Sequence, residues 1–323
     1  MTSPWVLGVD SGGSGLRAAL APVEGPVVGP LSAPEPVRTS AEGIDADHLT
    51  GLLVPLVERL RAEAGAPVGD PVVAACVGAA GMATLGDQLR ARLPGALRAS
   101  LGVERLALAA DAVTAYVGAL GQVPGAVVAA GTGMIALGTD LTRWWRADGW
   151  GHLLGDCGGG AWIGRAGLEA AMRAHDGREG GSEALLAEAE RRFGPAGSLP
   201  GQLYPRTDRP AVLASFTREV ASAAVAGDAV ARRILDEAAR EIARSTQAVC
   251  PADTESAVAL TGGLFGMGTP LLVPLERELS ERLPRAKRVE PAGDPLWGSV
   301  CVARALAGEG LRLPEEPGLL SSY

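Results

Sequence analysis

A short pattern of strand, glycine-rich turn and strand occurs twice in this chain of 323 residues. The first copy, residues 6–20, reads VLGVD, SGGSG and LRAAL, and the second, residues 127–138, begins just after Pro124-Gly125. Two copies of one supersecondary unit indicate an internal duplication. We therefore expect an α/β protein with two similar lobes that face one cleft, each lobe opening with one copy of the pattern.

The remaining segments extend this expectation to the whole chain. Helical periodicity predicts helices at about 45–64 and through most of 183–249, and the apolar runs VVAACVGAAG and RLALAA predict buried parallel strands. A strand at 257–260, a strand near Val289 and a helix at 300–306 follow, and the tail after Leu313 is expected to be disordered. The expected division is an N-terminal lobe at 1–121, a C-terminal lobe with a helical insertion at 122–300, and a terminal helix and tail at 301–323 that would pack back on the first lobe.

Composition narrows the class of partner. The net charge of −8 and the pI near 5.1 argue against broad contact with nucleic acid or an anionic membrane, because both would repel an acidic surface. No apolar stretch approaches the length of a membrane span, and the N-terminus lacks a basic segment followed by an apolar run. The four cysteines are scattered, with no CxxC pair. These features favour a cytoplasmic protein that binds small molecules, with a homodimer left open.

The chain has a single lysine, Lys287, near its C-terminal end. A P-loop needs a lysine directly after its glycine turn, and protein kinases need a lysine on a strand beside the ATP phosphates. Neither position is filled here. If the chain handles a nucleotide, backbone amides, hydroxyls and a metal ion must hold the phosphates.

The first glycine turn follows Asp10 and contains Gly12, Gly13 and Ser14. A carboxylate at a strand end can position Mg²⁺, and the N–H groups of a glycine turn can bind phosphate oxygens. An ordinary hairpin turn is the alternative interpretation of the same residues. A dinucleotide-binding fingerprint is disfavoured, because a strand rather than a helix follows the glycines.

The second turn, Gly131-Thr132-Gly133, occupies the equivalent place in the second copy. Its glycines would allow a phosphate to approach closely, and its hydroxyl can donate or accept a hydrogen bond. A triphosphate held from both lobes needs donors on each side, so the pairing of the two turns favours ATP. Gly262-Gly263, after the strand AVAL, would similarly admit adenine or ribose, or would simply be a turn that enters a helix.

Asp111 follows the apolar run LALAA and precedes a helical segment. In this position a carboxylate can cap the helix and nothing more. Phosphoryl transfer, however, needs a base that orients the acceptor hydroxyl, and a carboxylate at a strand end is suited to that role. Because the same chain contains two candidate phosphate turns, we favour the catalytic interpretation of Asp111.

The densest signal is the glycine-rich stretch from residue 148 to 164. Such a stretch is expensive to order, which indicates that it binds something. The carboxylate of Asp156 could accept hydrogen bonds from sugar hydroxyls, and backbone groups of Gly149 and Trp150 could bind others. A loop that caps a helix is the alternative. His152 is interpreted as structural, and Cys157 as a packed thiol, with a reactive thiol or a shared iron–sulfur ligand as alternatives.

The order of these motifs resembles the N-acetylglucosamine kinase branch of the BadF/BadG/BcrA/BcrD-type ATPase family. The resemblance covers nearly the whole chain, and its most specific block is GWGHLLGD. Seven motifs carry the resemblance. They are VLGVDSGGSG, VGAAG, DAVTAY, AAGTG, DGWGHLLGDCGGGAWIGRAG, AVAGDAVARRILDEAA and LTGGLFGMGTPLL.

The resemblance implies two ribonuclease-H-like lobes, as in actin-like ATPases, with a central cleft for ATP and sugar. It also implies roles for individual residues. Magnesium would be bound by Asp10, and the phosphates by Asp10, Gly12, Gly13, Ser14, Gly131, Thr132 and Gly133. Adenosine would be bound by Gly262 and Gly263. Asp111 would be the catalytic base, and the sugar would be bound by Asp111, Gly149, Trp150, Asp156 and Gly160.

The chain departs from the family pattern in three places. Met134-Ile135 follows the GTG turn where polar or small residues are usual, Cys157 replaces a usual Glu, and Thr39-Ser40 stands where an Asn is expected. A lost polar contact to a buried hydroxyl is costly, so these departures bear on which sugar is accepted.

The expected activity is ATP- and Mg²⁺-dependent phosphorylation of the 6-hydroxyl of an amino sugar, with N-acetylglucosamine first and glucosamine second. Two alternatives belong to other classes. One is an ATP-driven activator of a dehydratase or reductase, which would need two cluster cysteines per chain, whereas Cys157 is the only suitably placed thiol. The other is a catalytically weak sensor of sugar and ATP.

Overall fold

The computed structural model describes residues 4–12, 15–40, 43–66, 70–252 and 255–323. The chain forms two compact units. Unit 1 comprises Met1–Gly125, Thr139–Trp144 and Val289–Tyr323, and unit 2 comprises Ala126–Gly138 and Trp145–Arg288. The domain limits expected after residues 121 and 300 remain predictions, and the compact units differ from them in that residues 289–300 belong with the N-terminal part.

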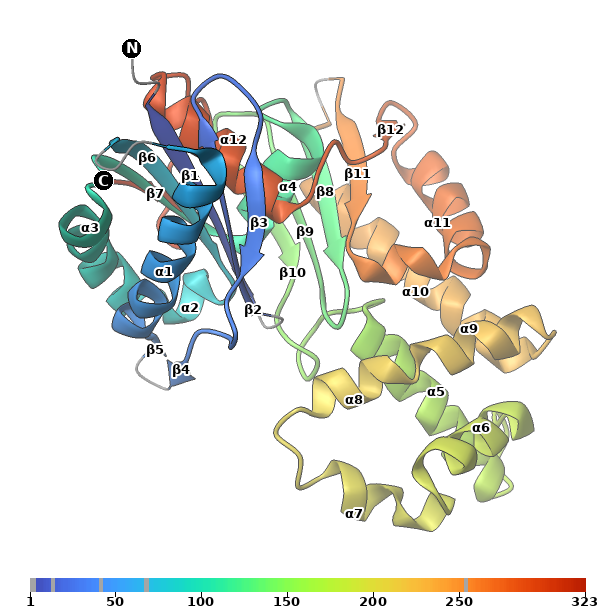
Figure 1. Ribbon diagram of the computed structural model, residues 1–323. Coiled ribbons are helices and arrows are strands. Elements are labelled where there is room, and N and C mark those ends of the chain that lie inside the picture. The colour runs from blue at the N-terminus through green and yellow to red at the C-terminus, as the bar shows by residue number, and fades with distance from the viewer. Residues whose placement is uncertain (1–3, 13–14, 41–42, 67–69, 253–254) are drawn as a thin grey trace. The chain divides into compact units, whose positions relative to one another are not determined.

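Unit 1 contains a six-stranded sheet with the order β13-β7-β6-β1-β2-β3 (Figure 1). The strands of unit 1 are β1 (Trp5–Gly12), β2 (Gly15–Pro22), β3 (Val28–Ser32), β4 (Thr39–Ser40), β5 (Gly43–Ile44), β6 (Val72–Ala79), β7 (Arg105–Ala110) and β13 (Leu320–Ser322), of which β4 and β5 form a separate two-stranded ribbon. Its helices are α1 (Ala46–Ala64), α2 (Met82–Leu85), α3 (Asp87–Leu101), α4 (Asp111–Leu120) and α12 (Pro295–Ala307).

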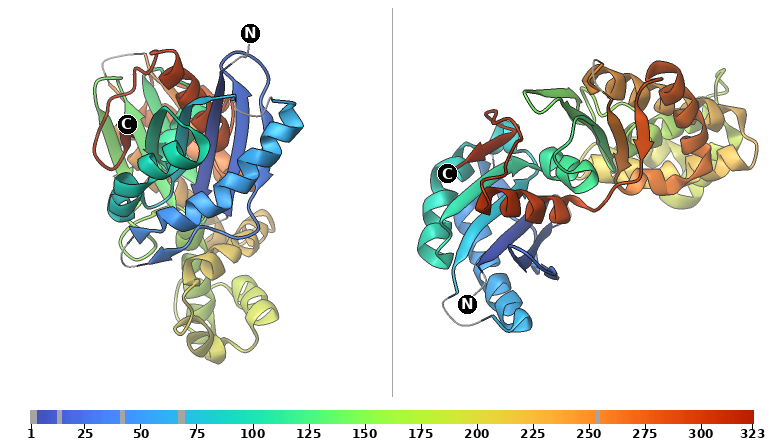
Figure 2. Two further views of the ribbon diagram at one scale, coloured as in Figure 1. Left: turned by 60° about the vertical axis from the view of Figure 1, so that its left-hand side comes forward. Right: turned by 90° about the horizontal axis from the view of Figure 1, so that it is seen from above.

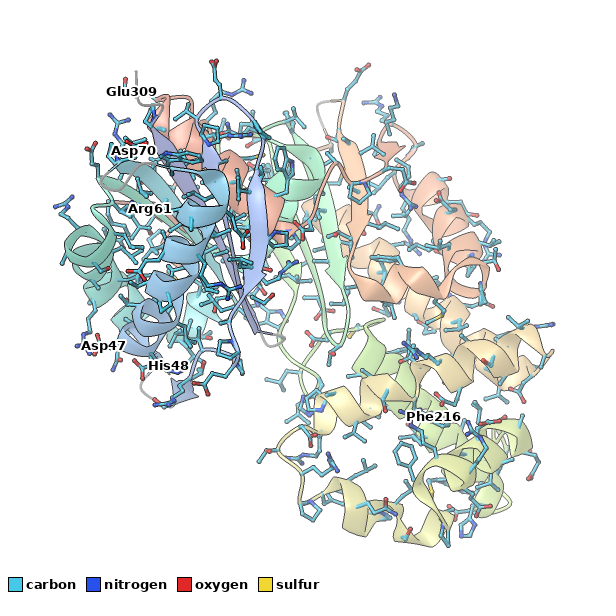
Figure 3. All side chains as sticks on the ribbon, in the orientation of Figure 1. Asp47, His48, Arg61, Asp70, Phe216 and Glu309 are labelled. Carbon is cyan, nitrogen blue, oxygen red and sulfur yellow. The ribbon has the colours of Figure 1, made fainter. Side chains whose placement is uncertain are left out.

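Helix α1 shows how local sequence sets an element in this unit. Asp45 caps its start by accepting the N–H of His48 at 3.0 Å, and Gly65 ends it in the left-handed conformation with φ of 62°. Leucines and a valine at helical spacing cover its buried face. His48 itself lies at the start of α1, where Figure 3 labels it, and its Nδ1 accepts the N–H of Arg38 at 3.1 Å.

Helix α1 packs on one face of the sheet, and the opposite face is covered by α4 and α12, which pack against each other (Figure 2). Glycines allow this close approach. A side chain at Gly298 would overlap the Thr114 carbonyl, and one at Gly118 would overlap the Asp294 carbonyl. On the sheet side, a Cβ at Gly8 would lie 2.5 Å from a Val300 methyl. Helix α12 is therefore seated directly on β1.

The C-terminal tail is ordered, which corrects the expectation of disorder after Leu313. Strand β13 pairs antiparallel with β7, and the N–H of Ala110 donates to the Leu319 carbonyl at 2.7 Å. Leu313 and Leu320 are buried. The prediction failed because a three-residue strand that pairs with a distant edge has no periodic signature of its own.

Unit 2 carries a five-stranded sheet with the order β10-β9-β8-β11-β12. Its strands are β8 (Gly125–Ala130), β9 (Met134–Thr139), β10 (Trp144–Asp148), β11 (Ala257–Thr261) and β12 (Lys287–Val289). Its helical elements are α5 (Gly160–His175), α6 (Glu183–Phe193), η1 (Ala196–Ser198), α7 (Leu199–Leu203), α8 (Arg209–Ser215), α9 (Thr217–Val225), α10 (Ala229–Val249), η2 (Gly263–Met267) and α11 (Thr269–Arg282).

The two sheets repeat one topology. In each unit the first strand is central, the second and third strands follow on one side, and the fourth and fifth follow on the other. In unit 1 these are β1, β2, β3, β6 and β7, with β13 added at the edge. The duplication expected from the two strand–turn–strand copies is therefore confirmed.

The helices inserted between β10 and β11 include α5, which the sequence did not reveal. Three glycines on α5 share one face and meet α8, α9 and the turn after β8. A Cβ at Gly160 would lie 2.6 Å from the Gly131 carbonyl, and side chains at Gly164 and Gly167 would overlap Leu213 and Val220. Phe216, fully buried, lies in the same insert, where Figure 3 labels it. Among the described residues, no helix has the length and apolarity that a membrane crossing requires.

Candidate functional site

Asp10 lies near the C-terminal end of β1, directly opposite Arg17 on β2. Both Arg17 contacts to Asp10 go to the same carboxylate oxygen: Nη2 lies 2.6 Å and Nε 3.2 Å from Oδ2. The third nitrogen of Arg17, Nη1, donates to Asp294 Oδ2 at 2.9 Å. Asp294 in turn caps α12 by accepting the Trp297 N–H at 2.9 Å. The carboxylate of Asp10 is thus linked through Arg17 to the start of α12.

The first glycine turn closes the β1–β2 hairpin, in which Gly12 pairs with Gly15. Gly13 and Ser14, which the sequence assigns to phosphate binding, lie outside the described residues. Of the residues assigned to this turn, the structure therefore describes Asp10 and Gly12.

Asp111 is the first residue of α4 and follows β7. Its side chain is exposed, and its Oδ1 accepts the N–H of Ala112 at 2.9 Å. Strands β1, β6 and β7 are parallel, and their registers bring Ser11, Ala79 and Ala110 into line. The Asp10 and Asp111 backbones thus lie at the same edge of this sheet, two strand spacings or about 10 Å apart.

In unit 2, the turn of Gly131, Thr132 and Gly133 joins β8 to β9, as the sequence predicts. The turn is fastened to the start of α5, because the N–H groups of Gly160 and Ala161 donate to the carbonyls of Gly131 and Thr132 at 2.9 and 2.8 Å. Gly160 is assigned to sugar binding, but its N–H already donates to a carbonyl of the protein. Gly131 and Thr132 remain exposed.

The carboxylate of Asp156 lies against this turn. A side chain at Gly133 would overlap Asp156 Oδ2, so glycine is required for the two to meet. Asp156 Oδ1 accepts the Gly151 N–H at 3.1 Å, and the residue is buried. The structure thus brings the candidate sugar carboxylate and the candidate phosphate turn together within one unit.

Gly262, at the end of β11, lies beside the same turn. It has φ of 103°, and a side chain there would overlap the Ala130 carbonyl, one residue before Gly131. Gly263 starts the short helix η2, and both glycines are exposed. The two glycines assigned to adenosine are therefore exposed, and Gly262 lies next to the second phosphate turn.

The loop that carries Gly149, Trp150 and Asp156 is held by two charged residues of β10. The carboxylate of Asp148 accepts the N–H groups of Asp156 and Cys157, the latter at 2.9 Å. Arg146 donates to the carbonyls of Asp148 and Gly149 at 3.2 and 2.6 Å. Its guanidinium also lies 4.3 Å from the centre of the Trp150 ring, whose side chain is 62% exposed.

Two aspartates of this loop have left-handed backbones, with φ of 62° at Asp148 and 56° at Asp156. Asp and Asn tolerate this region better than other residues, yet it still costs about 1 kcal/mol or more for a non-glycine residue. Such conformations persist where surrounding bonds enforce them. The bonds to the Asp148 carboxylate are of that kind.

Burial raises the pKa of Asp156, and the nearby charge of Asp148 raises it further, while the backbone hydrogen bond from Gly151 opposes the shift. Burial also raises the pKa of the Cys157 thiol, again with help from Asp148. A raised thiol pKa suits a packed cysteine and disfavours a reactive one. Among the described residues there is no cluster of three or more His, Cys, Asp or Glu side chains that could hold a metal.

Three residues of this arrangement were missed by sequence reasoning: Arg17, Arg146 and Asp148. Arg17 could have been found, since a hairpin with a two-residue tip pairs position 10 with position 17. Arg146 and Asp148 could not, because Arg146 reaches its two carbonyls around the left-handed backbone of Asp148, and Asp148 accepts N–H groups eight and nine residues further along the chain.

Known proteins are similar to this chain over most of its length. An N-acetylmuramic acid/N-acetylglucosamine kinase from Clostridium acetobutylicum is 27% identical to this chain over 310 residues, which are 93% of this chain and 98% of that protein. The solved structure of a candidate N-acetylglucosamine kinase from Chromobacterium violaceum is 27% identical and has a TM-score of 0.71, covering 94% of this chain and 100% of its own.

A more distant structure supports the fold alone. A ROK family glucokinase from Streptomyces griseus, solved with glucose and AMPPNP, has a TM-score of 0.56 at 20% identity and covers 94% of this chain and 99% of its own. With the two repeated strand orders, these matches confirm the expected α/β fold of the actin-like ATPases. The family model of the BadF/BadG/BcrA/BcrD ATPases matches residues 7–303. This chain belongs to the BadF/BadG/BcrA/BcrD ATPase family.

Proposed function

We propose that this protein transfers the γ-phosphoryl group of ATP to the 6-hydroxyl of an amino sugar, with N-acetylglucosamine as the first candidate and glucosamine as the second. The observation that carries the proposal is the contact between Asp156 and Gly133. The Asp156 carboxylate lies so close to Gly133 that a side chain at position 133 would overlap it. A sugar kinase must hold a hydroxyl and a phosphate next to each other, and this contact puts a carboxylate suited to hydroxyls beside a turn suited to phosphates.

Asp111 is the proposed base. Its exposed carboxylate accepts the proton of the sugar hydroxyl while that oxygen bonds to the γ-phosphorus and the bond from the γ-phosphorus to the β,γ-bridging oxygen breaks. The products are the sugar phosphate and ADP. Positioning supplies much of the catalysis in such transfers, so a carboxylate held at a helix start after a parallel strand is suited to this role.

The residues present fit a magnesium ion. Magnesium in phosphoryl-transfer sites is usually held by one or two carboxylates, phosphate oxygens and waters rather than by a cage of side chains. Asp10 offers such a carboxylate and would hold the ion through water; both Arg17 bonds go to Oδ2, so Arg17 leaves the second oxygen, Oδ1, unused. Bound magnesium would neutralise part of the charge on the phosphates.

The choice of acceptor rests on the relatives and on one departure in the chain. The Clostridium relative is named for N-acetylmuramic acid as well as N-acetylglucosamine. Ile135 packs against Gly149, since a Cβ at position 149 would lie 2.8 Å from the end of the Ile135 side chain. An apolar residue thus lies against the loop that would bind the sugar, so the acceptor is best decided by comparing sugars with and without an acyl group.

The test is conversion of ATP to ADP in the presence of Mg²⁺, with one sugar at a time. The panel is N-acetylglucosamine, glucosamine, N-acetylmannosamine, N-acetylmuramic acid, glucose, 6-deoxy-N-acetylglucosamine and no sugar. We expect turnover with at least one amino sugar and none with the 6-deoxy compound, which lacks the acceptor hydroxyl. Hydrolysis at the same rate without sugar would instead favour an activator, and binding without turnover a sensor.

Replacing Asp111 with Asn tests the assigned base in the same assay. Asn keeps the size of the side chain and can still accept the Ala112 N–H, but it cannot take a proton. We expect kcat to fall by roughly 10²- to 10⁴-fold, the usual contribution of a positioned base. ATP binding, measured by calorimetry, should stay close to that of the unsubstituted protein. Retained turnover in D111N would remove Asp111 from the mechanism.

A further inference from the structure

The loop of residues 149–157 has one carboxylate at its base. Asp148, the last residue of β10, accepts the N–H groups of two consecutive residues, Asp156 through Oδ1 and Cys157 through Oδ2. Both carboxylate oxygens are therefore used to close a loop of eight to nine residues. A charged acceptor makes such bonds stronger than neutral ones.

Space around Asp148 is matched to this arrangement. A side chain at Gly155 would overlap Asp148 Oδ1. The left-handed backbone of Asp148 turns the chain out of β10, and Arg146 fixes that turn by donating to the carbonyls of Asp148 and Gly149. Asp148 thus binds two N–H groups at the end of the loop, and Arg146 binds the two carbonyls where the loop begins.

The hydrogen bond from the Asp156 N–H to Asp148 also affects where the Asp156 side chain points. Its backbone is left-handed, and its carboxylate reaches Gly151 on one side and Gly133 on the other. Rotation of the backbone at Asp156 would swing the carboxylate away from Gly133. The acceptor that holds its N–H therefore also sets where the carboxylate points.

We propose that Asp148 is the positioning residue of the sugar-binding loop: its carboxylate holds the N–H groups of Asp156 and Cys157 and so aims the Asp156 carboxylate at the turn of Gly131, Thr132 and Gly133. This inference rests on the proposed function for its effect on sugar. Its structural part, the closing of the loop, holds independently of any reaction.

The variant that tests it is Asp148→Asn. Asn tolerates a left-handed backbone and has the same shape, but its NH₂ group cannot accept a backbone N–H, so one of the two loop bonds is lost. The matched control is Asp140→Asn. Asp140 also accepts two nearby backbone N–H groups, those of Thr142 and Arg143 at 2.8 and 3.1 Å, but both bond to its Oδ1, and Asp140 takes no part in the loop.

Two measurements are made on both variants. In steady-state kinetics with the best sugar of the panel, D148N should raise the KM for sugar by roughly 10- to 100-fold, as loss of a charged hydrogen bond predicts, while the KM for ATP stays unchanged. In hydrogen–deuterium exchange of the full chain without ligands, followed by mass spectrometry, peptides from 149–158 should exchange at least about tenfold faster in D148N. D140N should show neither change.

The outcomes separate the two proposals. If the unsubstituted protein phosphorylates no sugar, the proposed function fails, and the exchange rate of 149–158 alone decides the role of Asp148. Unchanged exchange in D148N overturns the inference whatever the kinetics show. Faster exchange with an unchanged KM for sugar overturns the link to sugar binding. Should D148N not fold, Asp148→Gly, which accepts the same backbone and also lacks the carboxylate, is measured in its place.

Discussion

Asp156, the proposed sugar ligand, carries a charge that its surroundings disfavour. Burial and the neighbouring charge of Asp148 raise its pKa above the ordinary value of 3.8. Protonation is therefore more favourable in the folded than in the unfolded state. The stability that this residue contributes is complete below the unfolded pKa and is lost as pH rises through the higher folded pKa. Above that range the carboxylate no longer stabilises the fold, which is consistent with a residue kept for binding.

We therefore expect Asp156→Asn to gain stability relative to the unsubstituted protein as pH rises from 4 to 7, while it weakens sugar binding. Asn removes the charge, but its single side-chain oxygen can accept only one of the two backbone N–H groups, those of Gly151 and Met134, that bond to the carboxylate. The thermal midpoint of D156N minus that of the unsubstituted protein should therefore rise between pH 4 and pH 7. Calorimetry across this range measures it.

Asp140→Asn supplies a control of opposite sign. Hydrogen bonds from the side chain and backbone of Thr142 lower the pKa of Asp140, so its contribution to stability is present at neutral pH and disappears as pH falls through the folded pKa. D140N should therefore be less stable than the unsubstituted protein at pH 7, with a deficit that closes on acidification. If the midpoint of D156N relative to the unsubstituted protein fell with rising pH, as that of D140N should, the account of Asp156 would be refuted.

At this scale the sequence predicts residue type better than residue geometry. Asp10, Asp111 and Asp156 are recognisable because they follow strands or stand among glycines, and the structure brings Asp156 to the turn at Gly133. The roles of Arg146 and Asp148 depend on φ values and on contacts that no local pattern encodes. The roles assigned to Asp10, Asp111 and Asp156, like the assignments of Gly13 and Ser14 to phosphate, stay predictions.

Among the elements, α5 depends most on small residues. Gly160, Gly164 and Gly167 occur at helical spacing on one face, where neighbouring backbone and side chains leave no room for a Cβ. This also explains why α5 escaped sequence analysis: glycine lowers helix propensity, so the segment reads as a loop. By contrast, α1 was predicted at about 45–64 and is observed at Ala46–Ala64, because its leucines are periodic and its caps are standard.

Two glycine-to-alanine changes test this difference. Gly164→Ala should destabilise unit 2, since the added methyl would overlap the Leu213 carbonyl, and such overpacking costs typically about 1–3 kcal/mol. Gly95→Ala in α3 meets nothing within 4 Å and should stabilise by about 0.5–1 kcal/mol, the helix preference of alanine over glycine. Urea unfolding followed by circular dichroism compares the two. If G164A were as stable as G95A, the close packing of α5 on α8 would be wrong.

For the whole molecule, the duplication was readable because it repeats a local pattern, whereas the path of the chain between the units was not. Unit 1 includes both the first 125 residues and the last 35, Val289–Tyr323. Helix α12 is joined to β1 by the Ser299 hydroxyl, which donates to the Val9 carbonyl at 2.9 Å in a buried setting. The terminal helix and tail at 301–323 were expected to pack on the first lobe, but contacts across 290 residues leave no local signal, so the sequence did not show that the segment from Val289 also belongs there.

The stability of unit 1 should therefore depend on the last five residues. Deleting 319–323 removes β13, which pairs with β7, and two leucines that are 7% and 1% exposed, so the loss is about 3–6 kcal/mol from apolar burial. It would also leave β7 as an unpaired edge strand, which promotes association. We expect a lower thermal midpoint and light scattering on heating. Tyr323→Ala, which alters an exposed side chain and keeps the strand, is the control and should behave like the parent chain. If the deletion left the midpoint unchanged, the tail would be dispensable, as the expectation of disorder implied.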